Sequence, residues 1–156
     1  MYSILEAVFL SKELHQSLFS PLCDKYDLTY AEMIVLLYVS VHPENNTATD
    51  VVINRRLTKS AVSMAVHSLA NRNLIHGFYE DGNHRSVHLK LCDGALKIID
   101  EASVIQKKYI GIITNGFNES ELETMGSDFK RISENVKNFR VDDKPYGKKN
   151  KKGGEA

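Results

Sequence analysis

The hydrophobic pattern changes its period between residues 58–71 and residues 74–91, and this change restricts the possible folds more than any other feature of the chain. Apolar residues in the first segment recur at intervals of three and four, which predicts a helix with one buried stripe. They are Val62, Ala65, Val66 and Leu69. In residues 85–91 apolar and polar residues alternate, which predicts a half-buried strand. A helix is therefore followed directly by β-structure.

Residues 74–80 are the predicted partner of that strand. Between the two lies Asp81-Gly82-Asn83-His84, and its Asp-Gly pair favours a tight turn, so we expect an antiparallel hairpin with a polar tip. We expect His76, His84 and His88 to be surface residues of this hairpin. Two strands alone are not stable in water, so the hairpin must pack on the helices before it. The predicted class is mainly α with one small antiparallel β-hairpin.

Capping signals and apolar spacing predict five more helices. Thr29 with Glu32, and Thr47 with Asp50, are spaced as capping boxes at the starts of the second and third helices. The five helices span about residues 4–22, 29–41, 47–56, 93–115 and 118–139.

The last helix carries apolar residues at spacings of 3, 4, 3, 4 and 3, which is the pattern of a coiled-coil seam. They are Leu122, Met125, Phe129, Ile132, Val136 and Phe139. Leu5 and Val8 belong to the apolar pattern of the first helix. Because little core remains to cover the seam, we expect these residues to pair with a second copy of the chain. Packing of the last helix on the first is the alternative.

The exposed face of the helix at 58–71 consists mostly of short hydrogen-bonding side chains, which suit contact with base edges. The face contains Lys59, Ser60, Ser63, Met64, His67 and Asn71. An ordinary solvated helix face is the alternative. The net charge of the whole chain is zero, yet residues 51–91 carry six basic and two acidic groups, a net charge of +4. A positive segment in a neutral chain is a possible footprint for a polyanion.

Other functional classes find little support. GxGxxG, GxxxxGK[ST], HExxH and GxSxG are all missing, so we do not expect an enzyme. Cys23 and Cys92 form no CxxC pair, and we expect neither a disulfide framework nor a cofactor or metal. No run of about 18 apolar residues and no basic leader is present, so we expect a cytoplasmic protein without membrane contact. Residues 141–156 are expected to be a disordered basic tail, which either touches DNA phosphates or only aids solubility.

The order of these elements is that of a winged helix-turn-helix flanked by long helices, and the chain resembles the MarR family of bacterial transcriptional regulators over about residues 4–139. The resemblance rests on Asp27-Leu28-Thr29, Thr49-Asp50-Val51-Val52, Leu57 to Ser63, Leu69 to Ile75, and Leu91-Cys92-Asp93-Gly94. The family's wing has an aspartate followed by two arginines, where this chain has Asn83-His84-Arg85, so only Arg85 matches. Asn73 replaces a usual glycine and also tolerates the left-handed conformation.

The resemblance implies four parts: a dimerisation helix at 1–28, a winged helix-turn-helix DNA-binding domain at 29–92, dimerisation helices at 93–140, and the tail at 141–156. It implies a homodimeric repressor that binds a pseudo-palindromic operator and responds to a small-molecule effector. Expected DNA contacts are Thr58, Lys59, Ser60, Ser63, Met64 and His67 in the recognition helix, and Asn83, His84 and Arg85 in the wing.

Relatives that sense oxidants or zinc suggest two further roles, for Cys23 and for His42, and we consider both minor. The effector site of the family lies between the dimerisation helices and the winged domain. A winged-helix module that binds a protein and not DNA is the alternative function, because the fold alone does not settle function.

Overall fold

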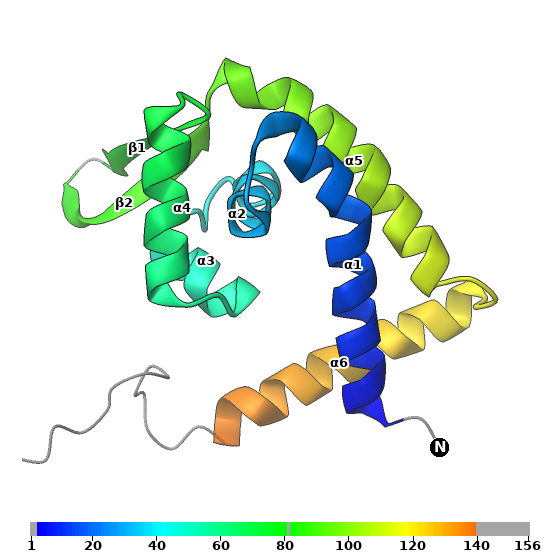
Figure 1. Ribbon diagram of the computed structural model, residues 1–156. Coiled ribbons are helices and arrows are strands. Elements are labelled where there is room, and N and C mark those ends of the chain that lie inside the picture. The colour runs from blue at the N-terminus through cyan, green and yellow to red at the C-terminus, as the bar shows by residue number, and fades with distance from the viewer. Residues whose placement is uncertain (1–2, 81, 140–156) are drawn as a thin grey trace, which may run out of the picture. The chain divides into compact units, whose positions relative to one another are not determined.

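A computed structural model describes residues 3–80 and 82–139 of the chain, without the side chains of residues 83, 84, 137 and 139 (Figure 1). The chain divides into two compact units, Met1–Ile113 and Thr114–Ala156. The first unit contains α1 (Ile4–Tyr26), α2 (Tyr30–Val41), α3 (Ala48–Arg55), α4 (Lys59–Asn71), β1 (Ile75–Glu80), β2 (Asn83–Leu91) and α5 (Asp93–Ile113). The second contains α6 (Glu119–Phe139). The expected mainly helical class with one hairpin is confirmed.

Helix starts follow the predicted capping residues. The hydroxyls of Thr29 and Thr47 accept the amides of Glu32 and Asp50, and both carboxylates accept the threonine amides in return. These two reciprocal boxes satisfy amides that have no partner within the helix. Ser3 caps α1 in the simpler form, through its hydroxyl alone. The first helix is longer than expected and continues through Pro21 to Tyr26.

Helix α2 lies at the centre of the first unit, with α4 and the hairpin on one side and α1 and α5 on the other (Figure 1). Met33, Leu36 and Tyr38 of α2 are fully buried, together with Phe19 of α1. Leu69 of α4 and Leu89 of β2 are equally buried and reach the same core. Burial of this apolar surface holds the hairpin and α4 against the other helices.

The hairpin differs from the prediction at its tip and along one face. Strand β2 begins at Asn83, which pairs with Glu80, so the turn is shorter than the four residues predicted. Val87 is 41% exposed, whereas His88 is only 8% exposed, so the prediction that His88 is a surface residue was wrong. The cause is the loop between α2 and α3, which pairs with the second edge of β2 through a bridge between Thr47 and His88.

The first turns of α5 bury a face that the apolar residues of the sequence do not mark clearly. Leu96 is 51% exposed, and Ala95 and Ile98 are buried in its place. The first turn of α5 packs beside the end of α4, since a Cβ added at Gly94 would lie 3.5 Å from the Asn73 carbonyl oxygen, an ordinary van der Waals contact. Three apolar residues at 96, 98 and 99 made the pattern ambiguous there.

Helix α6, described by itself, begins as predicted, because Asn118 and Glu121 exchange hydrogen bonds of 3.0 and 2.8 Å. Phe129, Ile132 and Val136 of its apolar seam are 52%, 41% and 50% exposed. The side chain of Phe139 and the basic tail lie outside the described residues. No helix in the described part of the chain has the length and hydropathy needed to cross a membrane.

Candidate nucleic-acid interface

Helix α4 presents a polar face because its other face is anchored in the core. Its first turn is capped by Thr58, whose hydroxyl accepts the Ala61 amide at 3.1 Å. Val62, Ala65 and Leu69 are buried, as the spacing predicted. The six residues expected to contact DNA are all exposed on the other side: Thr58, Lys59, Ser60, Ser63, Met64 and His67.

A groove of about 800 Å³ runs between α3, α4 and the hairpin. Four of those six residues line it, namely Lys59, Ser60, Ser63 and His67. Met64 does not line the groove and is 71% exposed. The hairpin closes the groove from its own side with Gly77 and Val87. The structure therefore brings the polar face of α4 and the wing to one surface, with Met64 set apart from the groove.

His67 has a defined hydrogen-bonding state on this face. Its Nε2 lies 3.1 Å from the amide nitrogen of Asn71, one helical turn further on. The amide nitrogen donates, so Nε2 accepts and a neutral ring carries its proton on Nδ1. His67 then offers a donor to solvent or to a base edge.

Two basic residues next to α4 were not singled out from the sequence. Arg55 ends α3, and Arg56, in the left-handed conformation with φ 54°, begins the turn to α4. Both are exposed, and the Arg55 guanidinium lies 5.2 Å from the centre of the Tyr38 ring. Together with Lys59 they place positive charge at the start of α4. The net charge of residues 51–91 was the signal that included them.

The wing is irregular where its arginine lies. Phe78 pairs with His88 and Glu80 pairs with Asn83, so a single residue of β1, Tyr79, faces four residues of β2, 84–87. Extra residues in one strand bend it and change the direction of its side chains. Arg85 is exposed within this bulged stretch. The side chains of Asn83 and His84 lie outside the described residues.

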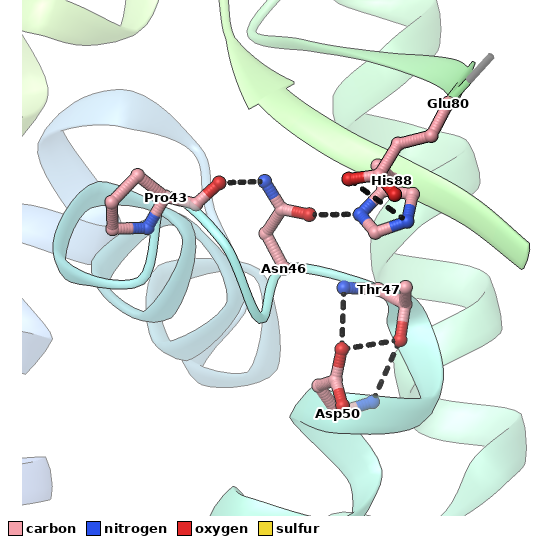
Figure 2. Close-up of polar contacts among 6 residues, drawn as sticks. All are labelled: Pro43, Asn46, Thr47, Asp50, Glu80 and His88. Carbon is pink, nitrogen blue, oxygen red and sulfur yellow. Dashed lines mark hydrogen bonds and ion pairs between the residues drawn. The ribbon is translucent and has the colours of Figure 1, made fainter.

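The base of the wing is held by a buried polar network (Figure 2). The Asn46 amide donates to the Pro43 carbonyl at 2.8 Å, and its oxygen lies 2.7 Å from His88 Nδ1. The backbone carbonyl of Asn46 accepts the Leu89 amide at 3.1 Å. Neighbouring Thr47 is tied to Asp50 by the capping box. One loop thus joins the start of α3 to β2.

The model of the SarA/Rot family of transcriptional regulators matches residues 17–102, more than half of the chain. The chain belongs to this family. A SarA/Rot-family regulator acts in transcription and is not an enzyme, as the sequence led us to expect. A comparison with curated proteins found no sequence relative.

Solved structures that are similar to this chain include MarR family transcriptional regulators. A putative MarR family regulator from Listeria monocytogenes, complexed with 26mer DNA, is 16% identical with a TM-score of 0.77, over 88% of this chain and 91% of that one. S. aureus MepR in its DNA-binding conformation is 15% identical with a TM-score of 0.77, over 86% and 99%. The S. aureus MepR-DNA complex is 17% identical with a TM-score of 0.70, over 86% and 96%. The expected winged helix-turn-helix fold is confirmed.

A second polar cluster of this SarA/Rot-family chain lies where α1, α2 and α5 meet. His15 Nδ1 lies 2.8 Å from the Tyr30 hydroxyl, and its Nε2 lies 3.1 Å from Gln106 Oε1. The ring stacks on Phe19 at 4.5 Å and meets Tyr109 edge-on at 4.8 Å. Burial lowers the pKa of His15 against the opposing effect of the Gln106 hydrogen bond, and Arg55 lowers it further. The sequence analysis did not single out this cluster.

The two candidate sensing residues have ordinary structural surroundings. Cys23 is buried, and burial raises the pKa of its thiol, as do the nearby Asp24 and Glu32, which disfavours the reactive thiolate. His42 donates from Nδ1 to the Tyr38 carbonyl at 2.9 Å and stacks on the Tyr38 ring. In residues 3–80 and 82–139, no three His, Cys, Asp or Glu side chains gather as metal ligands would.

Proposed function

We propose that the protein is a homodimeric repressor that binds a pseudo-palindromic DNA operator. The observation that carries this proposal is the exposed polar face of α4, set beside the wing along one groove. A helix with such a face fits the major groove, while the tip of a wing reaches the adjacent minor groove. Two of the similar solved structures are complexes with DNA. The protein would act in the cytoplasm, where its operator lies.

The proposed contacts divide into two kinds. Ser60, Ser63, Met64 and His67 contact base edges in the major groove. Thr58 and Lys59 contact phosphates at the start of α4, where the amide ends of a helix also favour an anion. In the wing, Arg85 enters the minor groove, and Asn83 and His84 are the other proposed wing contacts. Residues 29–92 form the DNA-binding part in this proposal.

The proposed dimer interface consists of apolar side chains of α1 and α6 that are exposed in the described part of the chain. At the start of α1, Leu5 is 68% and Val8 is 52% exposed, and Ile4 and Phe9 are 65% and 69% exposed. The α6 seam is exposed to a similar degree. Large apolar patches of this kind are typical of surfaces that meet a partner. We propose that residues 1–28 and 93–140 pair two copies, so that each α4 meets one half-site.

We further propose that a small-molecule effector controls the repressor. The cluster around His15 joins α1 and α5, which belong to the proposed dimerisation part, to the first residue of α2. An effector that prefers one arrangement of these helices would change the spacing of the two α4 helices. Titration with effectors that alter DNA affinity tests this part separately.

A negative charge introduced on the exposed polar face of α4 tests the proposed DNA contact, and this test does not require the operator sequence to be known. Wild-type protein should bind random-sequence duplex DNA at low salt, and the affinity should fall steeply as salt is added. Ser63→Glu places a carboxylate on the face of α4 and should weaken binding at least about tenfold. Ser103→Glu adds the same charge at an exposed position of α5, away from α4 and the wing, and serves as the matched control.

Equal binding by both variants would contradict the role of α4. Absence of binding by the wild type would favour a winged-helix module whose partner is a protein.

A further inference from the structure

The buried ring of His88 has an oxygen atom beside each of its two nitrogens (Figure 2). On one side Nδ1 lies 2.7 Å from Asn46 Oδ1. On the other side Nε2 lies 3.7 Å from Glu80 Oε1. The Phe78 ring covers the histidine, with its centre 5.6 Å away. His88 is thus the only residue drawn in Figure 2 that connects the α2–α3 loop to both strands of the wing.

The direction of the hydrogen bonds around Asn46 determines which nitrogen of the His88 ring carries a proton. Asn46 already donates its amide to the Pro43 carbonyl, so its oxygen accepts and His88 Nδ1 must donate. A neutral ring then has a lone pair on Nε2, which faces a carboxylate oxygen. A second proton on Nε2 turns that contact into an ion pair with Glu80. A doubly protonated ring would thus have an acceptor beside each of its nitrogens.

His88 also stands at the last regular point of the wing. Its pair with Phe78 is the final register pair before the bulged stretch 84–87. Its backbone bridges to Thr47, and the next amide, of Leu89, donates to Asn46. Beyond this point toward the tip, the contact between His88 and Glu80 links the base of β2 to the end of β1. Arg85 lies in the part of β2 between them.

We propose that His88 is a positioning residue for the wing, and that its doubly protonated ring holds Glu80 and thereby the bulged stretch that carries Arg85 in the arrangement that meets DNA. The ion pair also offsets the negative charge of Glu80, which would otherwise repel phosphates near the minor groove. This inference rests on the proposed function.

Other titratable groups near His88 have different surroundings. Asp50 of α3 accepts from the amide and hydroxyl of Thr47. The ring of His76 in β1 lies next to the Phe78 ring. Lys90 of β2 is the residue opposite His76 in the register of the two strands. Glu80 is the carboxylate that faces the ring directly, and its side chain is 57% exposed. Its replacement by the uncharged Gln therefore removes the ion pair with little effect on packing.

The test is a double-mutant cycle at two pH values, using the full-length chain and a duplex that the wild type enriches from a random library. Affinities of the wild type, Glu80→Gln, His88→Gln and the double variant are measured near pH 6 and near pH 8, on either side of the usual histidine range. The effect of Glu80→Gln should differ by about threefold to tenfold between the two pH values when His88 is present. It should be the same at both when His88 is replaced.

Two controls keep the result decisive. His67 and His84 also lie in the proposed interface, so His67→Gln and His84→Gln must each leave the pH-dependent effect of Glu80→Gln in place. If thermal unfolding shows that His88→Gln does not fold, loss of the pH-dependent effect in either of these two variants would overturn the inference. An effect of Glu80→Gln that is equal at both pH values, or that persists without His88, overturns the inference. If the wild type enriches no duplex, the proposed function fails and the inference fails with it.

Discussion

The imidazole of His15 and the hydroxyl of Tyr30 are joined by a hydrogen bond of 2.8 Å that links α1 to the first residue of α2. Gln106 Oε1 accepts from Nε2, and burial lowers the pKa of His15, which favours the neutral ring; in that ring the hydroxyl of Tyr30 donates to Nδ1. This single side chain therefore connects the two helices that enclose the core, α1 and α5, to the winged part. A proton on Nδ1 would remove the acceptor that Tyr30 uses.

We expect the free energy of unfolding to fall as pH drops below about 6.5, the usual pKa of a histidine. Burial lowers the pKa of His15 in the folded chain, so between that lowered value and 6.5 the unfolded chain binds more protons. The contribution of His15 to the free energy of unfolding is fully present above pH 6.5 and is lost as the pH falls below it. Urea unfolding at a series of pH values measures it. His15→Gln should flatten the profile, whereas His67→Gln, at an exposed position, should not.

Asn73 lies just after the end of α4 and has the left-handed conformation, with φ 54°. The amides of Asn73 and Leu74 donate to the carbonyls of Ala70 and Leu69 at 3.0 and 2.9 Å, which is a Schellman motif. Asn73→Ala should lower the free energy of unfolding by about 1 kcal/mol, because a Cβ is strained there. Asn73→Gly should be neutral or slightly stabilising. Equal losses in both variants would mean that the amide side chain of Asn73, and not its backbone conformation, matters.

The cap of α4 depends on one hydroxyl. Thr58→Ala removes the acceptor of the Ala61 amide and should cost about 1 kcal/mol in the free energy of unfolding. Thr58→Ser keeps an acceptor at the same place and should recover most of that stability. Urea denaturation of the three proteins makes the comparison. A serine variant as unstable as the alanine variant would argue against the cap.

Much of this fold could be predicted because its signals are local. Thr29, Thr47 and Asn118 each begin a helix that their capping spacing marks, and the stripe at Val62, Ala65 and Leu69 is buried as expected. The exposure of the six recognition residues follows from that same stripe. These features depend on neighbours three or four positions away, which a sequence displays directly.

What the sequence could not predict depends on residues far apart in the chain. His88 is buried because the loop around Asn46, 42 positions earlier, covers the outer edge of β2. His15 gains its partner Gln106 across 91 positions. The bulge around Arg85 leaves no mark in the alternation of apolar and polar residues. Pairings of this kind are decided by tertiary packing and not by local preference.

Lys59 and Met64 should affect DNA binding in different ways. Lys59→Ala should weaken binding on all sequences and reduce the slope of log affinity against log salt by about one. Met64→Ala should leave the slope unchanged and relax the preference at one base pair, because an apolar side chain contacts a base edge and not a phosphate. Lys108→Ala, on exposed α5, is the control for charge alone. Salt titrations on an enriched duplex distinguish these results; a changed slope with Met64→Ala would contradict the assignment.

The exposed seam of α6 should carry the dimer. Phe129→Asp places a charge among the apolar residues of the seam and should shift the protein toward monomers, because an unpaired carboxylate is costly to bury. Ser127→Asp adds the same charge off the seam and should leave the association unchanged. Sedimentation velocity over a range of concentrations measures both. A monomeric wild type would rule out the seam as a dimer interface.

The most direct test selects bound duplexes from a random DNA library with the purified full-length protein. It shows whether two copies of the chain, each with its α4 and wing, bind DNA symmetrically. A homodimer with one α4 per half-site should enrich a two-fold symmetric motif with half-sites about 10 bp apart. Enrichment of no sequence, or of a single half-site without symmetry, would contradict the homodimeric operator-binding function.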